Sequence, residues 1–120
     1  MARILLADDD AAARDLVQRA LASDGHDVVA THDGAEALEQ LQGGSARFHL
    51  LISDVQMPGV DGIELIEKAL AIAPDMRVIL MSGYTDELDR AKHLKSKIAR
   101  GISKPFTLEQ VRAVVRSVLA

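Results

Sequence analysis

The sequence predicts an α/β fold in which parallel strands and helices alternate along the whole chain. Five short aliphatic runs occur in 120 residues, and most are apolar throughout rather than alternating with polar residues. Continuous apolar runs of this length are typical of strands that are buried on both faces of a parallel sheet. The segments between them carry apolar residues at intervals of three and four, as amphipathic helices do. This order of elements favours a doubly wound sheet with right-handed crossovers.

Five strands are expected, at residues 3–7, 27–30, 48–53, 76–81 and 99–103. The first, third and fourth runs, RILLA, FHLLIS and MRVILM, are strongly hydrophobic. The second and fifth runs, DVVA and ARGIS, are weaker, which is typical of strands at the edges of a sheet.

Five helices are expected between and after these strands, and capping signals mark where four of them begin. Asp10 is well placed to cap the first helix, and Asp33, Asp61 and Thr107 each stand three residues before a Glu or Gln. The first helix should bury Ala13, Leu16, Val17, Ala20 and Leu21. The last should bury Leu108, Val111, Val115 and Val118. The fourth helix, within residues 86–97, has the weakest apolar pattern.

The composition argues against several functional classes. Aromatic residues make up 2% of the chain and the net charge is −4, so neither base stacking nor nonspecific nucleic-acid binding is expected. The absence of cysteine excludes disulfides, thiolate metal sites and cysteine nucleophiles. No apolar run approaches a membrane span and no signal peptide opens the chain. We expect a cytoplasmic protein with one domain at residues 1–120, no output domain and no membrane partner.

Polar residues follow four of the predicted strands, at the edge of the sheet where open α/β folds bind their ligands. They are Asp8 and Asp9, Asp54, Ser82 and Gly83, and Lys104. Neighbouring carboxylates raise each other's cost of ionisation, and Mg²⁺ relieves that cost. A carboxylate can also attack phosphorus, and Lys104, the Ser82 hydroxyl and the Gly83 N–H would then balance the phosphoryl charge. The set predicts a phosphoryl-accepting aspartate site.

Asp54 is the expected nucleophile within this set. An aliphatic run leads up to it, and the tight turn Pro58-Gly59 would fold the following loop back over the site. The backbone carbonyl of Gln56 lies in that loop and would complete a metal shell. Taken singly, each residue has a plainer interpretation, because acids after strands often cap helices and Lys-Pro is usually a turn. The prediction of a phosphoryl-accepting site depends on finding all of these residues together, each group at the end of a different predicted strand.

The segments ILLADDD, LLISDVQMPGVDGIEL, VILMSG and ISKPF together resemble the receiver domain of two-component response regulators, which has the CheY-like fold. The resemblance covers essentially the whole chain. It implies a five-stranded parallel sheet in the order 2-1-3-4-5 with five helices, and a phosphoacceptor at Asp54. It further implies that Asp8, Asp9, Asp54 and the Gln56 carbonyl bind Mg²⁺ or Mn²⁺, that Ser82 is the switch hydroxyl, and that the Lys104-Pro105 bond is cis.

The resemblance also implies partners. Phosphate would come from a histidine kinase or a histidine phosphotransfer protein, and signalling would use the face formed by helix 4, strand 5 and helix 5. The chain would be no enzyme beyond slow self-dephosphorylation. Gly101 departs from the family, which usually has Tyr or Phe there, and Tyr84 is a candidate to take part of that role. A narrower resemblance is to CpdR-type stand-alone receivers, which are adaptors for a protease.

An unusual basic block coincides with the end of the fourth predicted helix. Residues 90–100 contain no acid and five basic residues, namely Arg90, Lys92, Lys95, Lys97 and Arg100. The simpler interpretation is a solvated helix face. The more specific one is a docking surface for an acidic downstream protein partner.

Two other functions fit part of the sequence. Asp8 and Asp10 have the spacing of the nucleophile and general acid in haloacid-dehalogenase-like phosphatases, but only a helix is expected after Lys104, and no cap domain is present. The second alternative is a constitutive adaptor that acts without phosphorylation and has a vestigial acidic pocket. Against this, none of the residues that phosphorylation needs is missing.

Overall fold

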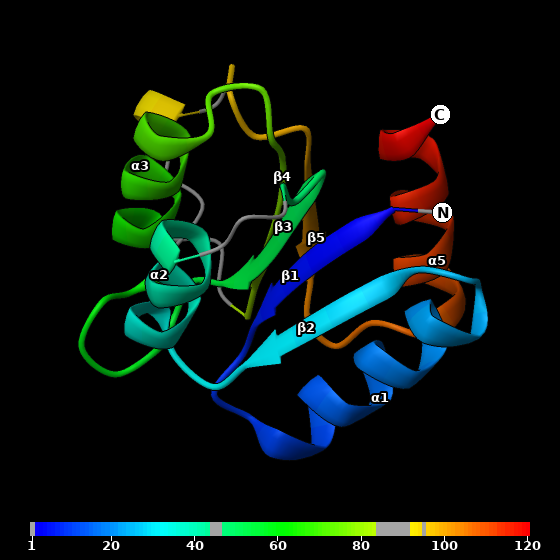
Figure 1. The fold of residues 1–120 in the computed structure, drawn as a ribbon. Helices are drawn as coiled ribbons and strands as arrows, with labels where there is room; N and C mark the ends of the chain where they lie inside the picture. The colour runs from blue at the N-terminus through cyan, green and yellow to red at the C-terminus, as the bar shows by residue number, and fades with distance from the viewer. Residues whose placement is uncertain (1, 44–46, 84–91, 95) are drawn as a thin grey trace.

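A five-stranded parallel sheet forms the centre of the molecule (Figure 1). The computed structural model describes residues 2–43, 47–83, 92–94 and 96–120. The strands are β1 (Arg3–Ala7), β2 (Asp27–Thr31), β3 (Leu50–Asp54), β4 (Arg77–Ser82) and β5 (Arg100–Ser103). Their order is β2-β1-β3-β4-β5. The expected order is confirmed, and the two weak apolar runs form the edge strands.

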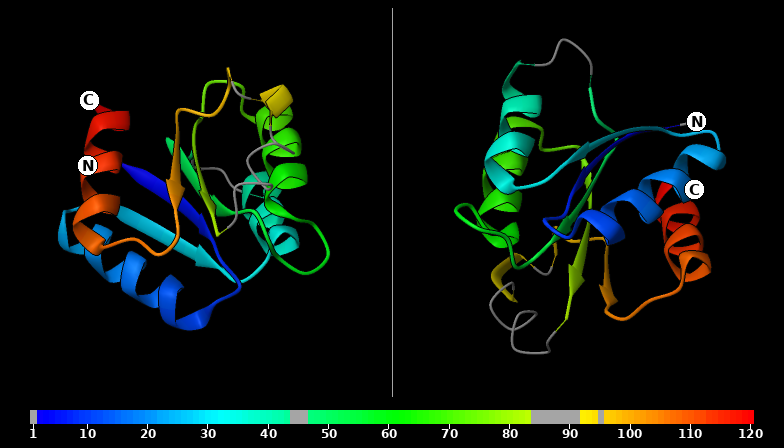
Figure 2. Two further views of the ribbon diagram at one scale, coloured as in Figure 1. Left: turned by 180° about the vertical axis from the view of Figure 1, so that it is seen from behind. Right: turned by 90° about the horizontal axis from the view of Figure 1, so that it is seen from below.

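Helices cover both faces of the sheet. They are α1 (Ala11–Ser23), α2 (Gly34–Gly43), α3 (Gly62–Ile72) and α5 (Leu108–Leu119), with a 3₁₀ turn η1 (Lys92–Leu94). In Figure 1, α2 and α3 lie to the left of the sheet and α1 and α5 to the right, and the two views of Figure 2 show the same division. No helix of the described part is long and apolar enough to cross a membrane.

The described residues contain four α-helices, where five were expected. Most of the segment predicted as the fourth helix lies outside the described residues, as do Tyr84, Arg90 and Lys95. The described part of that segment is the single turn η1, whose buried side chain is Leu94, together with Ser96 and Lys97 in a turn. After this turn the chain continues into β5.

The alternation of side chains explains why the central strands are apolar throughout. On β1, Leu5 and Ala7 pack with α2 and α3, whereas Ile4 and Leu6 pack with α1 and α5. Successive side chains of a strand point to opposite faces, so a strand between two helix layers needs an apolar residue at every position.

The four predicted capping residues all cap a helix. The Asp10 side chain accepts hydrogen bonds from the N–H groups of the first turn of α1. Asp33 accepts from the Glu36 N–H at 2.8 Å, and Asp61 accepts from the Glu64 N–H at 3.0 Å. Thr107 forms a full capping box at the start of α5. These side chains satisfy N–H groups that have no partner within the helix.

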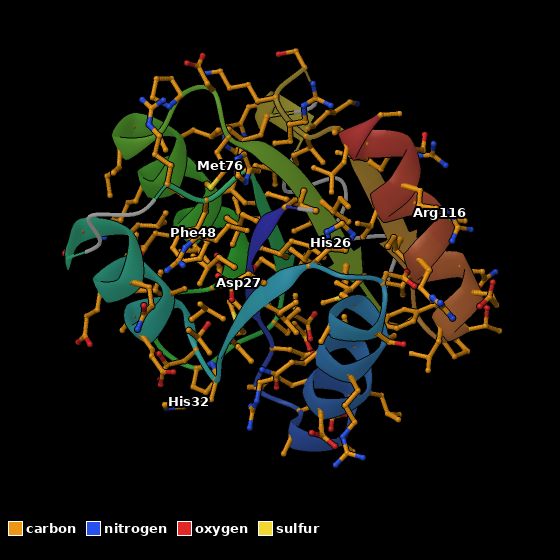
Figure 3. All side chains as sticks on the ribbon, turned by 45° about the vertical axis from the view of Figure 1, so that its right-hand side comes forward. His26, Asp27, His32, Phe48, Met76 and Arg116 are labelled. Carbon is orange, nitrogen blue, oxygen red and sulfur yellow. The ribbon has the colours of Figure 1, made fainter. Side chains whose placement is uncertain are left out.

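Because all five strands run in one direction, their carboxyl ends meet at one edge of the sheet. This edge lies toward the bottom of Figure 1. In Figure 3, His26 lies where β2 begins and His32 lies just beyond its carboxyl end. The edge near His32 is where ligands bind in open α/β sheets.

Candidate functional site

Three carboxylates meet at the carboxyl edge. Asp8 follows β1 and Asp54 ends β3, and these two strands are neighbours in the sheet. Asp8, Asp9 and Asp54 each offer one oxygen atom, and these oxygens lie within 4.8 Å of one another. Asp8 is fully buried and Asp54 is 6% exposed, whereas Asp9 is exposed. The structure therefore brings together the three acids that the sequence predicted as metal ligands.

Asp8 is held at the bottom of this cluster. Its Oδ1 accepts a hydrogen bond from the Asp10 N–H at 3.0 Å, and Oδ2 has no hydrogen-bond partner among the described residues. Burial raises the pKa of Asp8 to about 6, against the opposing effects of the Asp10 N–H and the Lys104 charge. A buried oxygen that receives no hydrogen bond from the described residues, beside two further carboxylates, fits a hard divalent cation such as Mg²⁺. The acidic cluster therefore has the donor atoms that a divalent metal ion requires.

Lys104 closes the site from the side of β5. Its Nζ lies 2.6 Å from Asp54 Oδ2 and 3.8 Å from Asp8 Oδ2. Burial tends to lower the pKa of Lys104, but the hydrogen bond to Asp54 and the nearby carboxylates outweigh it and leave the pKa above its ordinary value. The Lys104-Pro105 bond is cis, as the resemblance implied. Lys104 is thus a charged ammonium group directly against the expected nucleophile.

The remaining predicted residues lie around the same edge. Ser82 is 2% exposed at the end of β4, and its carbonyl accepts a hydrogen bond from the Lys104 N–H at 2.7 Å. Gly83 and Gln56 line a cavity of about 660 Å³ together with Asp9, Asp54 and Lys104. Gln56 is exposed, in the loop after β3. Every residue that the sequence predicted for the site lies at this edge.

One wall of the cavity is apolar, which the sequence did not predict. Leu16 and Leu108 line it with Phe106, and they are 52% and 37% exposed. The prediction that Leu16 and Leu108 pack in the core is wrong. Their neighbours on the same helices, Val17 and Val111, are buried against the sheet, while Leu16 and Leu108 face the cavity beside the acidic edge.

Three further residues position the site without belonging to it. The Thr31 hydroxyl donates to the Leu6 carbonyl at 2.8 Å, and the Thr31 carbonyl accepts from the Asp8 N–H at 3.2 Å. Arg14 donates to the Asp8 carbonyl at 2.8 Å. At Gly62, an added Cβ would lie 2.0 Å from the Asp54 carbonyl oxygen. The residue types alone carry no signal for these contacts, which depend on how strands and loops meet.

The sheet order and this acidic edge together define a CheY-like α/β protein. The family model of the response regulator receiver domain matches residues 4–116. The chain belongs to this family, whose members act in two-component signalling.

Named relatives agree with this assignment. The chain is 28% identical to the chemotaxis protein CheY4 of Vibrio cholerae, with a TM-score of 0.87 and 98% of each chain covered. It is 26% identical to the response regulator TrrA of Thermotoga maritima, solved in complex with Mg²⁺-BeF, with a TM-score of 0.85. That match covers 98% of this chain and 99% of TrrA.

A curated relative is longer than this chain. The response regulator MprA of Mycobacterium ulcerans is 34% identical over 117 residues, which are 98% of this chain and 50% of MprA. The chain therefore spans about half the length of the curated relatives it matches.

Proposed function

We propose that the chain accepts a phosphoryl group on Asp54 and signals through protein contacts. The observation that carries the proposal is the placement of the Lys104 ammonium 2.6 Å from Asp54, beside the carboxylates of Asp8 and Asp9. A simple ion pair between Lys104 and Asp54 would not require two further acids beside it. A phosphoryl acceptor requires them, because the transferred group needs cations around it and a metal cation needs carboxylate ligands.

The transfer is a displacement at phosphorus. One carboxylate oxygen of Asp54 forms a bond to phosphorus as the bond from phosphorus to the donor atom breaks, and the electron pair of that bond leaves with the donor. Lys104 balances negative charge on the phosphoryl oxygens, and the Ser82 hydroxyl and the Gly83 N–H donate hydrogen bonds to them. The product is an acyl phosphate, and the chain hydrolyses it slowly at most.

Asp8, Asp9, Asp54 and the Gln56 carbonyl would hold Mg²⁺ or Mn²⁺. The bound metal would neutralise negative charge that develops on the phosphoryl group. The Mg²⁺-BeF complex of the similar TrrA supports this ligand chemistry for the present chain.

The phosphodonor is a histidine kinase or a histidine phosphotransfer protein. Leu16, Phe106 and Leu108 form an apolar wall beside Asp54, and two of these side chains are large and exposed. Exposed apolar side chains beside a reactive group are typical of a protein contact. The donor protein would cover this wall while its histidine reaches the carboxylate of Asp54. The downstream partner would use the face formed by β5, α5 and the segment that precedes β5.

The two alternatives have less support. In a phosphatase of the haloacid-dehalogenase type, Asp10 would be the general acid, but its side chain accepts from the Ala12 and Ala13 N–H groups as the cap of α1. The chain after Lys104 continues into α5 rather than into a further strand. A constitutive adaptor would need none of the Asp8, Asp54 and Lys104 geometry.

The proposal is tested with acetyl phosphate as donor. The wild type should acquire one acid-stable, base-labile phosphoryl group when Mg²⁺ is present, as read by intact mass, and Asp54→Ala should acquire none. Asp75→Ala is the matched control, because Asp75 is exposed and lies at the opposite end of the sheet, beside the start of β4. Stoichiometric labelling of Asp54→Ala would show that another residue is the acceptor.

A further inference from the structure

The charge of the chain is unevenly distributed. Five of its 14 basic residues fall within residues 90–100, which contain no acid. Because the whole chain carries −4, removing these five positive charges leaves −9 for the rest. A short stretch of sequence dense in positive charge, within a negative protein, creates a local potential that attracts anionic groups.

The basic side chains of this segment lack the partners that most others have. Elsewhere in the described residues, an ion pair or a hydrogen bond engages the side chains of Arg3, Arg14, Arg19, Lys68, Arg77, Lys104 and Arg112. Lys92, Lys97 and Arg100 are exposed and have no such contact with any described residue. No acidic residue in the described ranges forms an ion pair with any of these three cations.

The backbone that carries these cations is anchored to the fold. Leu94 is buried, and the N–H groups of Lys97 and Ile98 donate to its carbonyl at 2.8 and 3.0 Å. His93 pairs with Glu67 of α3 at 3.1 Å, and the Ala99 N–H donates to the Val78 carbonyl of β4 at 2.9 Å. Because contacts with α3 and with β4 hold His93 and Ala99 in place, binding a partner here would require little additional ordering of the backbone.

The position of the segment leaves the acidic edge accessible. Arg100 begins β5, whereas Lys104 follows its last residue, Ser103, so the two lie at opposite ends of one strand. The left view of Figure 2 faces this side of the molecule, with α5, β5 and η1 across it. A partner on Lys92, Lys97 and Arg100 would not cover Asp54.

We infer that Lys92, Lys97 and Arg100 form a docking surface for an acidic segment of a partner protein. The partner is a protein segment rather than nucleic acid because a long polyanion would also meet the negative charge on the rest of the chain. A short acidic segment places its carboxylates on the basic surface alone. The inference deepens the proposed function by naming the chemistry of the downstream partner, but binding itself does not require phosphorylation.

The test compares two charge-reversal variants of the whole chain. Lys97→Glu/Arg100→Glu removes part of the basic surface, and Arg19→Glu/Arg47→Glu makes the same change of charge at exposed residues on α1 and before β3. The probe is a fluorescein-labelled peptide of ten glutamates at low salt, and circular dichroism checks that both variants are folded. We expect about a fivefold loss of affinity in the first variant and less than about twofold in the second.

Equal losses in the two variants would contradict the inference, because they would show a response to net charge alone. A DNA duplex of equal charge that binds more tightly than the peptide, and whose binding is lost in Lys97→Glu/Arg100→Glu, would also contradict the inference. Labelling of Lys97→Glu/Arg100→Glu by acetyl phosphate separates the two proposals. If the wild type is labelled on Asp54 but does not bind the peptide, only the docking surface is wrong. If the wild type binds the peptide but is not labelled on Asp54, only the phosphoacceptor is wrong.

Discussion

Asp8 is the most deeply buried carboxylate of the acidic edge. It is fully buried, its Oδ2 has no hydrogen-bond partner among the described residues, and burial raises its pKa to about 6 from an ordinary value of 3.8. A carboxyl group with a raised pKa destabilises the folded state when it is ionised. Without a metal ion, the ionised carboxylate of Asp8 therefore destabilises the folded protein at neutral pH. This charge is useful for binding a metal ion, not for the stability of the fold.

Asp8→Asn should accordingly be more stable than the wild type at pH 8 in the absence of divalent cations, by on the order of 2 kcal/mol. The cost of the ionised carboxylate is fully present above pH 6 and absent below pH 3.8, so the advantage should disappear as the pH falls through this interval. Urea denaturation at several pH values measures it. A variant that is less stable than the wild type at pH 8 would contradict this account of Asp8.

The same variant tests the metal site. Mg²⁺ should raise the free energy of unfolding of the wild type, because it binds only the folded arrangement of the carboxylates. Asp8→Asn should lose most of this gain, whereas Asp75→Asn, at an exposed position away from the acidic edge, should keep it. An equal Mg²⁺ effect on all three proteins would place the metal elsewhere.

At the scale of elements, the start of α3 is packed directly against the strand that ends in Asp54. Gly62 donates its N–H to the Val55 carbonyl at 2.8 Å, and an added Cβ would lie 2.0 Å from the Asp54 carbonyl oxygen. The helix can begin this close to the site only because the residue has no side chain.

Gly62→Ala should therefore destabilise the protein by about 2 kcal/mol or more, and weaken phosphorylation of Asp54 in the fraction that remains folded. Gly43→Ala is the matched control, because no described atom beyond its chain neighbours and its own helix backbone lies within 4 Å of the position of its Cβ at the end of α2. Alanine is the better helix former, so this control should be neutral or slightly stabilising. Chemical denaturation compares the two, and equal effects would contradict the close packing.

The ion pair between Asp24 and Arg112 joins the end of α1 to α5. Arg112 Nε donates to Asp24 at 2.9 Å, and this hydrogen-bonded contact lowers the pKa of Asp24 below its ordinary value. A carboxyl group with a lowered pKa stabilises the fold at any pH above 3.8, the pKa of the group in the unfolded chain. This contribution is lost as the pH falls through the lower pKa of the folded state.

Asp24→Asn should thus lower the melting temperature at pH 7, with a difference that shrinks progressively below pH 3.8. Asp75→Asn, whose carboxylate is exposed and for which no ion pair to a described residue is found, should melt like the wild type at both pH values. Thermal unfolding followed by circular dichroism measures both variants. A pH-independent difference for Asp24→Asn would mean that packing, rather than the ion pair, holds α5 to α1.

Local sequence signals predicted most of the elements but not what each side chain packs against. The first strand was placed at residues 3–7, as observed, because its run of apolar residues matches a strand between two helix layers. The four capping residues were predicted because a cap acts within three residues of itself. Leu16 and Leu108 are exposed although their spacing predicts burial. Helical spacing alone does not distinguish a side chain that packs on the sheet from one that lies beyond the edge of the sheet.

Over the whole molecule, the topology explains why the site was predictable. Asp8, Asp54 and Lys104 are far apart in the sequence, yet each follows or ends a strand of one parallel sheet, and such strands end at a common edge. The supporting contacts of Thr31, Arg14 and Gly62 were not predictable, because they depend on distances between elements. The sheet order therefore brings reactive groups from three separate segments of the chain to one place.

The central claim is that Asp54 is the residue that becomes phosphorylated, and reductive trapping tests it most directly. After incubation with acetyl phosphate and Mg²⁺, borohydride reduces an aspartyl phosphate to homoserine, and peptide mass mapping locates the change. We expect homoserine at position 54 of the wild type and no homoserine in protein that received no phosphodonor. Homoserine at Asp8 or Asp9 with Asp54 intact would contradict it.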